Sequence, residues 1–244
     1  MLTIGLEILR VLAESESPLT ATAIAERVGL HVSNVSRALR VLANAGYVRK
    51  PTYHSFAPDL GVLALAGAAA TRLPLIERTG GLIRNAATGS GMLVVLATLF
   101  RDQVLYLHRC GPGQEPQSAI AGGFPLHRSV AGLRLLLDRP AAEAEAALTT
   151  AARRYGWDRP TPATPTDPAA CLSAARARLH DGVLAIHGWD DPGRCAIAIA
   201  LDVPGQAPLA LAVDVRAEPA TATPQALLCL TTLAAAIRTR LEQP

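Results

Sequence analysis

The residues with the clearest capacity for chemistry are hydrogen-bond donors on a helix predicted from Val32 to Ala45. One face of this helix carries five of them: Ser33, Asn34, Ser36, Arg37 and Arg40. The opposite face is apolar, with Val35, Leu39 and Leu42 at helical spacing. Arginine can donate two hydrogen bonds to a guanine edge, and serine and asparagine can contact phosphates or base edges. A solvated helix face would have a similar composition, so the neighbouring elements must decide between the two interpretations.

The charge around this helix is one-sided. No acidic residue lies between Glu26 and Asp59, whereas five basic residues do: Arg27, Arg37, Arg40, Arg49 and Lys50. The net charge of the whole chain is only +3, which is too small to indicate a nucleic-acid partner by itself. The distribution, however, predicts a local basic face.

The elements around the donor helix predict a winged helix-turn-helix. Helices are expected from Leu6 to Ala13 and from Thr20 to Val28, with Thr20 as the N-cap of the second, and Gly46 ends the third. Two short strands, 47–50 and 53–56, form a wing. In this motif the third helix enters the major groove. The predicted DNA-binding set is therefore Thr20, Ser33, Asn34, Ser36, Arg37 and Arg40, with Arg49, Lys50 and His54 on the wing.

Beyond residue 57 the composition changes and an α+β domain is predicted. An apolar linker helix is expected within 58–73, followed by a domain of residues 74–244. Its helices are predicted at 75–87, 131–137, 141–154, 168–180 and 224–241, and its strands at 92–96, 104–108, 183–187, 195–201 and 209–215. The fold class is thus α+β with two domains, the first being residues 1–57.

Cys195 and His127 suggest a second chemistry, that of a nucleophile and its base. No third residue is placed to orient them, and a cysteine at the start of an alternating strand is more often a buried small residue. His127 and Arg128 could instead hold an anion near the N-terminus of the next helix, or form a surface turn. The four cysteines lack zinc-site spacing, and no phosphate-binding loop is present. Neither metal nor cofactor is expected.

The apolar stretches are too short to suggest a membrane protein. The longest, Gly61 to Ala70, is interrupted soon afterwards by Arg72 and Pro74. The N-terminus has no basic start followed by an apolar core, so no secretion signal is predicted. We therefore expect a cytoplasmic protein without a membrane partner.

Several motifs resemble the IclR family of bacterial transcription regulators. The N-terminal matches are Leu6 to Leu9, Leu19-Thr20, Ile24-Ala25, Gly29 to Leu39, Leu42 and Gly46 to Val48. Further matches are Asp59 to Gly61, Val104 to Arg109, Pro125 to His127, Val130 to Gly132, Thr166 to Pro168, Pro192 to Cys195, Asp202 and Thr223-Pro224. Together they span nearly the whole chain.

The resemblance implies a winged helix-turn-helix, a linker helix and a GAF-like α/β effector domain, assembled as dimers or dimers of dimers on double-stranded operator DNA. It also implies a small-molecule effector, with an organic acid as one candidate. The residues carried over to the effector site are Leu126, His127, Arg128, Ser129, Val130, Ala131, Gly132, Trp189, Cys195, Asp214 and Arg216.

The effector domain departs from the family pattern at several positions. Leu133 replaces a usual lysine, and Ile186 and Trp189 stand where acidic residues are usual. Asp214 and Arg216 replace residues that are often small and hydroxylated. These departures leave two alternatives beside an effector-controlled regulator: a ligand-independent DNA-binding protein with a degenerate sensor domain, and an enzyme that uses Cys195 and His127.

Overall fold

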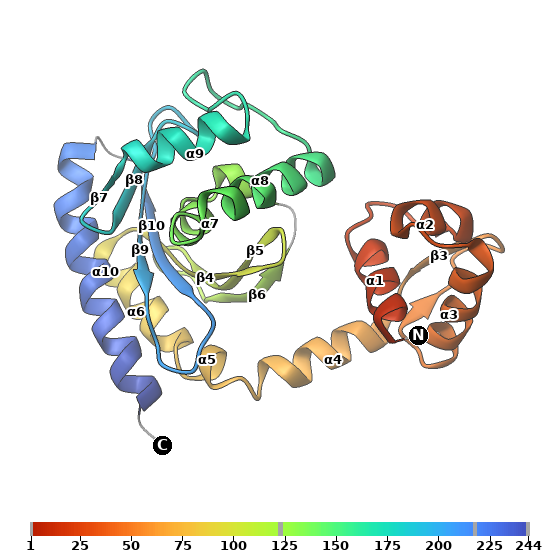
Figure 1. Ribbon diagram of the computed structural model, residues 1–244. Helices are drawn as coiled ribbons and strands as arrows, with labels where there is room; N and C mark the ends of the chain where they lie inside the picture. The colour runs from red at the N-terminus through yellow and green to blue at the C-terminus, as the bar shows by residue number, and fades with distance from the viewer. Residues whose placement is uncertain (1, 122–123, 217–218, 243–244) are drawn as a thin grey trace. The chain divides into compact units, whose positions relative to one another are not determined.

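A computed structural model describes residues 2–121, 124–216 and 219–242, and the chain forms two compact units, Met1–Arg72 and Leu73–Pro244 (Figure 1). No single helix in the described part is long and apolar enough to cross a membrane. The segments Leu60–Ala70 and Pro74–Ser90 reach that length and composition only when they are taken together as a bent pair.

The first unit is a winged helix-turn-helix. Its elements are α1 (Leu2–Ala13), β1 (Leu19–Thr20), α2 (Ala21–Val28), α3 (Val32–Asn44), β2 (Val48–Arg49), β3 (Ser55–Pro58) and α4 (Leu60–Ala70). The strands pair antiparallel in the order β1-β3-β2. Ile8, Ile24, Val35 and Leu39 are fully buried between the helices. The predicted helices are confirmed, although α1 begins at Leu2 rather than at Leu6. Of the two wing strands, β2 is shorter than predicted, and β3 has the predicted length but lies two residues further along the chain.

Both ends of α2, the helix that precedes the tight turn into α3, are set by local interactions. The hydroxyl of Thr20 accepts a hydrogen bond from the Ala23 amide, at 3.2 Å, which confirms the predicted N-cap of α2. Gly29 ends α2 with φ of 67°, a left-handed conformation that glycine adopts without strain. The two helices are therefore held at a fixed turn.

The second unit is built on one antiparallel sheet, in the order β6-β5-β4-β10-β9-β8-β7. The strands are β4 (Leu93–Phe100), β5 (Gln103–Cys110), β6 (Gln117–Ala121), β7 (Leu179–His180), β8 (Val183–His187), β9 (Cys195–Leu201) and β10 (Leu209–Val215). The helices are α5 (Pro74–Glu77), α6 (Gly80–Ser90), the 3₁₀ turn η1 (Leu126–Arg128), α7 (Val130–Leu136), α8 (Ala141–Tyr155), α9 (Pro168–Ala177) and α10 (Pro219–Glu242).

Helices cover both faces of this sheet (Figure 1). We call the side covered by α7, α8 and α9 the α7 face, and the side covered by α6 and α10 the α10 face. Strand alternation divides the core between them, because successive side chains point to opposite faces. On β10, Ala210 and Ala212 belong to the core of the α7 face, whereas Leu211 and Val213 belong to that of the α10 face.

Four elements of the second unit differ from the sequence prediction. The helix expected at 75–87 is two helices, α5 and α6, and the helix expected to reach His180 ends at Ala177 before β7. The closing helix begins at Pro219, so Pro224 lies inside it although proline was expected to start it. Strand β6 was not predicted, because it depends on pairing with β5 rather than on a strong apolar alternation.

Helix α7 lies close to the sheet, and Gly132 permits this approach. A Cβ atom at Gly132 would lie 2.5 Å from Val104 Cγ2 and 2.7 Å from Leu126 Cδ1. Beneath the helix the strands present alanines, among them Ala198, Ala210 and Ala212. The small residues on both sides therefore set the distance between α7 and the sheet.

We expect Gly132→Ala to destabilise the protein by about 1–3 kcal/mol, because the added methyl group overpacks a core with little free space. Urea unfolding followed by circular dichroism measures the change. Gly89→Ala is the matched control, since nothing lies within 4 Å of a Cβ at that helical position. Replacing glycine by alanine there should be neutral or stabilise by up to about 1 kcal/mol. Equal stabilities for the two variants would contradict the close approach.

Candidate functional site

The predicted recognition face of α3 is exposed in the structure. Ser33, Asn34, Ser36, Arg37 and Arg40 are all solvent-exposed. The opposite face is anchored, with Val35 and Leu39 fully buried and Ala38 nearly so. The helix therefore holds its five donors outward on a rigid apolar base, and no carboxylate of α3 competes for them.

The wing adds an exposed basic and aromatic group. Arg49, Lys50 and His54 are exposed, as predicted, and Tyr53 is 84% exposed beside them. The Tyr53 and His54 rings meet edge to face at 4.7 Å, and the Lys50 ammonium lies 5.1 Å from the centre of the Phe56 ring. Tyr53 was not among the predicted DNA-binding residues. The available signal in the sequence was its position next to His54 in the predicted wing. Thr20, in contrast, uses its hydroxyl to cap α2.

Most of the segment 126–132 is packed inside the second unit. Leu126, Val130 and Ala131 belong to the core of the α7 face, and His127 and Ser129 are each 2% exposed. Ser129 caps α7 by accepting a hydrogen bond from the Gly132 amide, at 3.1 Å. The polar chemistry of this segment therefore comes from His127, Arg128 and Ser129.

His127 is a buried, neutral imidazole held by the loop that follows α8. Its ring stacks on Trp157 at 4.0 Å, and its Nε2 lies 2.9 Å from the carbonyl oxygen of Asp158. A carbonyl can only accept, so Nε2 carries the proton and donates. Burial lowers the pKa of His127, although the Asp158 contacts oppose this shift.

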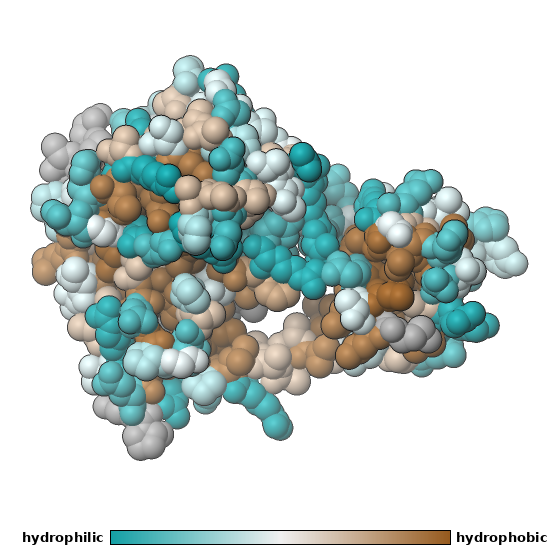
Figure 2. Space-filling model, in the orientation of Figure 1, coloured by the Kyte–Doolittle hydropathy of each residue, from teal (hydrophilic) through white to brown (hydrophobic). Residues whose placement is uncertain are grey.

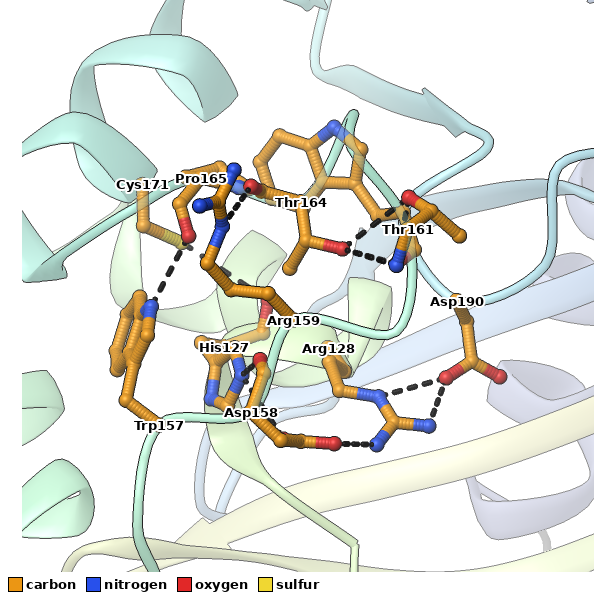
Figure 3. A network of polar contacts seen from close by, with 11 residues as sticks. His127, Arg128, Trp157, Asp158, Arg159, Thr161, Thr164, Pro165, Cys171 and Asp190 are labelled. Atoms are coloured by element: carbon orange, nitrogen blue, oxygen red, sulfur yellow. Dashed lines mark hydrogen bonds and ion pairs between the residues drawn. The ribbon is translucent and has the colours of Figure 1, made fainter.

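Arg128 joins two loops that are far apart in the sequence (Figure 3). Its guanidinium donates to Asp158, in the loop after α8, and to Asp190, in the loop between β8 and β9. The guanidinium also lies 5.4 Å from the centre of the Phe124 ring. Two carboxylates thus share one arginine, and these ion pairs hold both loops against η1.

The same two loops are tied together by buried threonines (Figure 3). The Thr164 hydroxyl donates to the Trp189 carbonyl at 2.6 Å, and Thr161 donates to the Gly188 carbonyl. Trp189 itself is 3% exposed, and its indole nitrogen is buried without a hydrogen-bond acceptor among the described residues. A buried donor without an acceptor costs free energy. The indole ring is covered in part by Arg178, whose guanidinium lies 5.6 Å from the ring centre.

Asp214 and Arg216 lie on the α7 face but do not pair with each other. Asp214 accepts from Arg194 at 2.8 Å, and Arg216 donates to Asp191. Tyr106 of β5 lies in the same region, since its hydroxyl donates to Ser129 at 3.0 Å. Burial raises the pKa of Tyr106, and the charges of Asp190 and Asp214 raise it further. The strand end, the loop 188–194 and η1 therefore form one charged group.

Cys195 is separated from this group by the sheet. It pairs with Val215 of β10 and belongs to the core of the α10 face, whereas Asp214 points the other way. The enzyme hypothesis requires Cys195 and His127 to lie together, and the structure does not bring them together. The cysteine that does lie near His127 is Cys171, and burial raises its pKa to about 12, so it is a protonated thiol.

Sequence reasoning missed the partners of the predicted residues. Asp158, Asp190, Asp191 and Arg194 complete the ion pairs, and Tyr106 reaches Ser129 from another strand. The consecutive aspartates before the turn Pro192-Gly193 were the one local signal. Their arginine partners could be found only from the tertiary structure.

The geometry defines a class of protein: a winged helix-turn-helix unit joined to an α/β unit with a polar cluster on one sheet face. Two family descriptions match the chain, "IclR helix-turn-helix domain" over residues 1–51 and "Bacterial transcriptional regulator IclR C-terminal" over residues 67–236. The chain belongs to the IclR family of bacterial transcriptional regulators.

Solved structures of this family share the fold. An IclR family transcriptional regulator from Brucella abortus has a TM-score of 0.77 at 22% identity, over 98% of this chain and 91% of that chain. A putative regulator from Silicibacter sp. TM1040 has a TM-score of 0.72 at 21% identity, over 97% and 96%. An IclR homologue from Microbacterium hydrocarbonoxydans, complexed with 4-hydroxybenzoate, has a TM-score of 0.68 at 22% identity, over 100% and 99%. A search of curated proteins finds no significant match.

Proposed function

We propose that this regulator binds operator DNA through α3 and the wing, and that a small molecule bound on the α7 face of the second unit changes its operator affinity. The carrying observation is the exposed donor face of α3 on its buried base of Val35 and Leu39. Donors in this arrangement can read base edges, whereas the basic wing residues contact phosphates or the minor groove.

Arg37→Ala and Arg40→Ala should each weaken binding to the preferred operator by about 1–3 kcal/mol, because each removes a base contact. Gel-shift titration against a duplex selected from a random pool by the wild type measures this. Arg27→Ala, at an exposed arginine of α2, is the control for loss of charge. This variant should weaken binding to all DNA sequences alike, because it removes only an interaction with the phosphates. Unchanged affinity in the Arg37→Ala, Arg40→Ala double variant would show that α3 is not the recognition helix.

The surface of α4 supports assembly as at least a dimer. The helix has no buried residue, and its Leu60, Leu63 and Leu65 are each more than half exposed. Figure 2 shows almost only apolar surface along it. An apolar helix of this kind is stable in water when a partner covers it. A second copy of the chain supplies that partner and a two-fold related DNA-binding surface.

Replacing Leu60 and Leu63 together by aspartate should raise the dimer dissociation constant by at least about a hundredfold, because these leucines lie about one turn apart on one face of α4 and the two charges would be buried against the partner helix. Analytical ultracentrifugation over a range of concentrations measures this. Leu228→Asp is the control, since this leucine of α10 is 71% exposed. A wild type that sediments as a monomer at micromolar concentration would refute the dimer.

The effector site that we propose lies between the segment 126–132 and the strand end with Asp214 and Arg216. The charge of this region supports the placement, because arginines and aspartates converge there. Each of Arg128, Arg194 and Arg216 already has a carboxylate partner. An organic acid therefore binds by displacing an aspartate, such as Asp191 from Arg216.

Aromatic and short-chain acids, with 4-hydroxybenzoate first, should raise the melting temperature of the wild type and release the operator. At a hundredfold excess over the dissociation constant the stabilisation is about 2.7 kcal/mol. Arg216→Ala should lose most of this response, whereas Cys195→Ala should retain it because Cys195 lies on the other face of the sheet.

Equal responses in the wild type and both variants would place the effector site elsewhere. A wild type that binds its operator but responds to none of the acids would instead support the ligand-independent regulator.

A further inference from the structure

Strand β5 carries polar residues that act on both faces of the sheet. Its pairing with β4 shifts register, so that Leu96 opposes His108 while Ala97 opposes Tyr106, and Leu107 is the extra residue of a bulge. Without the bulge, Tyr106 and His108 would point to the same face. The bulge turns them to opposite faces, which is a recurrent use of such irregularities.

On the α10 face, His108 forms a buried tie between three segments. It is 2% exposed, and its Nε2 lies 3.0 Å from the carbonyl oxygen of Ile76 in α5. Its Nδ1 lies 2.8 Å from the Ser118 hydroxyl of β6. The carbonyl can only accept, so Nε2 donates to Ile76 and Nδ1 accepts from Ser118. Gly80, at the start of α6, lies against the same ring.

The position of Ile76 gives this tie its significance. The second unit begins at Leu73, and α5 is its first helix, directly after the segment that follows the linker helix α4. Helix α5 is one turn long and none of its residues is fully buried, although Leu75 packs against the core of the α10 face. The hydrogen bond from His108 joins the backbone of α5 directly to strand β5 of the sheet.

On the α7 face, Tyr106 makes the corresponding contact with the proposed effector site. Its hydroxyl donates to Ser129, the N-cap of α7 and the neighbour of Arg128. A ligand that moves η1 or α7 therefore acts on β5 through Tyr106. Two residues further along the strand, His108 holds the segment that leads to α4.

We propose that His108 is a positioning residue that couples the effector side of the sheet to the exit of the linker helix through the bulge of β5. The inference rests on the proposed function, because it supplies a route by which effector binding reaches the DNA-binding unit. The coupling requires that a substitution at Tyr106 change the local stability of α5, and that this effect depend on His108.

The first experiment measures amide hydrogen exchange of residues 76–78 in the full-length protein, with neither DNA nor effector. His108→Leu should speed exchange there by about tenfold, because the Ile76 carbonyl loses its donor. His108→Gln, which keeps a donor and an acceptor, should restore much of the protection. Leu201→Ala is the control, a fully buried position of β9 on the same face. It should lower the melting temperature without this local effect.

The second experiment tests the transfer across the sheet. Tyr106→Phe removes only the hydroxyl that contacts Ser129, and it should change exchange at residues 76–78 by about threefold or more. In the His108→Leu background the same substitution should have no effect there, which is a non-additive cycle. If His108→Leu does not fold, Ser118→Ala, at an exposed residue, weakens the tie and replaces it in the cycle.

Operator affinity completes the test. His108→Leu should lower affinity for the selected duplex by about fivefold or more, and Leu201→Ala should not, because only the first loosens the linker exit. Two results would overturn the coupling role. One is amide exchange at residues 76–78 that is equally fast in His108→Leu and Leu201→Ala. The other is an effect of Tyr106→Phe on this exchange that is the same in the wild-type and His108→Leu backgrounds. The exchange results do not depend on DNA, so a wild type without operator binding would contradict the proposed function alone.

Discussion

The close approach of α7 to the sheet is the constraint on which the polar cluster depends. Alanines on β9 and β10 and the missing side chain of Gly132 allow helix and strands to meet without a layer of large side chains. This contact fixes the N-terminus of α7, and with it η1. His127 and Arg128 therefore start from a rigid base, and the loops after α8 and β8 assemble around them.

Charge balance then defines what the cluster can do. Arg128, Arg194 and Arg216 are paired with four aspartates, so each arginine has a carboxylate partner without a ligand and the aspartates exceed the arginines by one. A partly buried arginine that lacked a partner would be costly, and the aspartates remove this cost. At the proposed effector site, a ligand would exchange one set of ion pairs for another. Since Asp190 and Asp191 belong to the loop 188–194, we expect such an exchange to act on that loop.

The two units use opposite physical strategies. The DNA-binding unit keeps its polar side chains outside on a small apolar core, so its donors are available to a partner. In the second unit the charged residues around η1 and the loop 188–194 are instead paired with one another. The first arrangement suits a preformed interface, and the second suits a site that responds when its internal pairs are replaced.

The sequence by itself determined the features that depend on neighbours in the chain. Apolar residues at helical spacing defined α3 and its donor face, and the capping chemistry of Thr20 set the start of α2. Strand alternation placed Asp214 and Arg216 on one face together. These are local properties, because each follows from residues within a few positions of one another.

The tertiary structure decided which segments meet. Arg128 finds Asp190 across 62 residues and His127 finds Asp158 across 31, separations at which periodicity carries no information. It also put Cys195 on the sheet face opposite His127. The face to which a strand side chain points can be assigned only when the register with the neighbouring strands is known. The same holds for the bulge of β5, which exists only in its pairing with β4 and which turns His108 toward the linker exit.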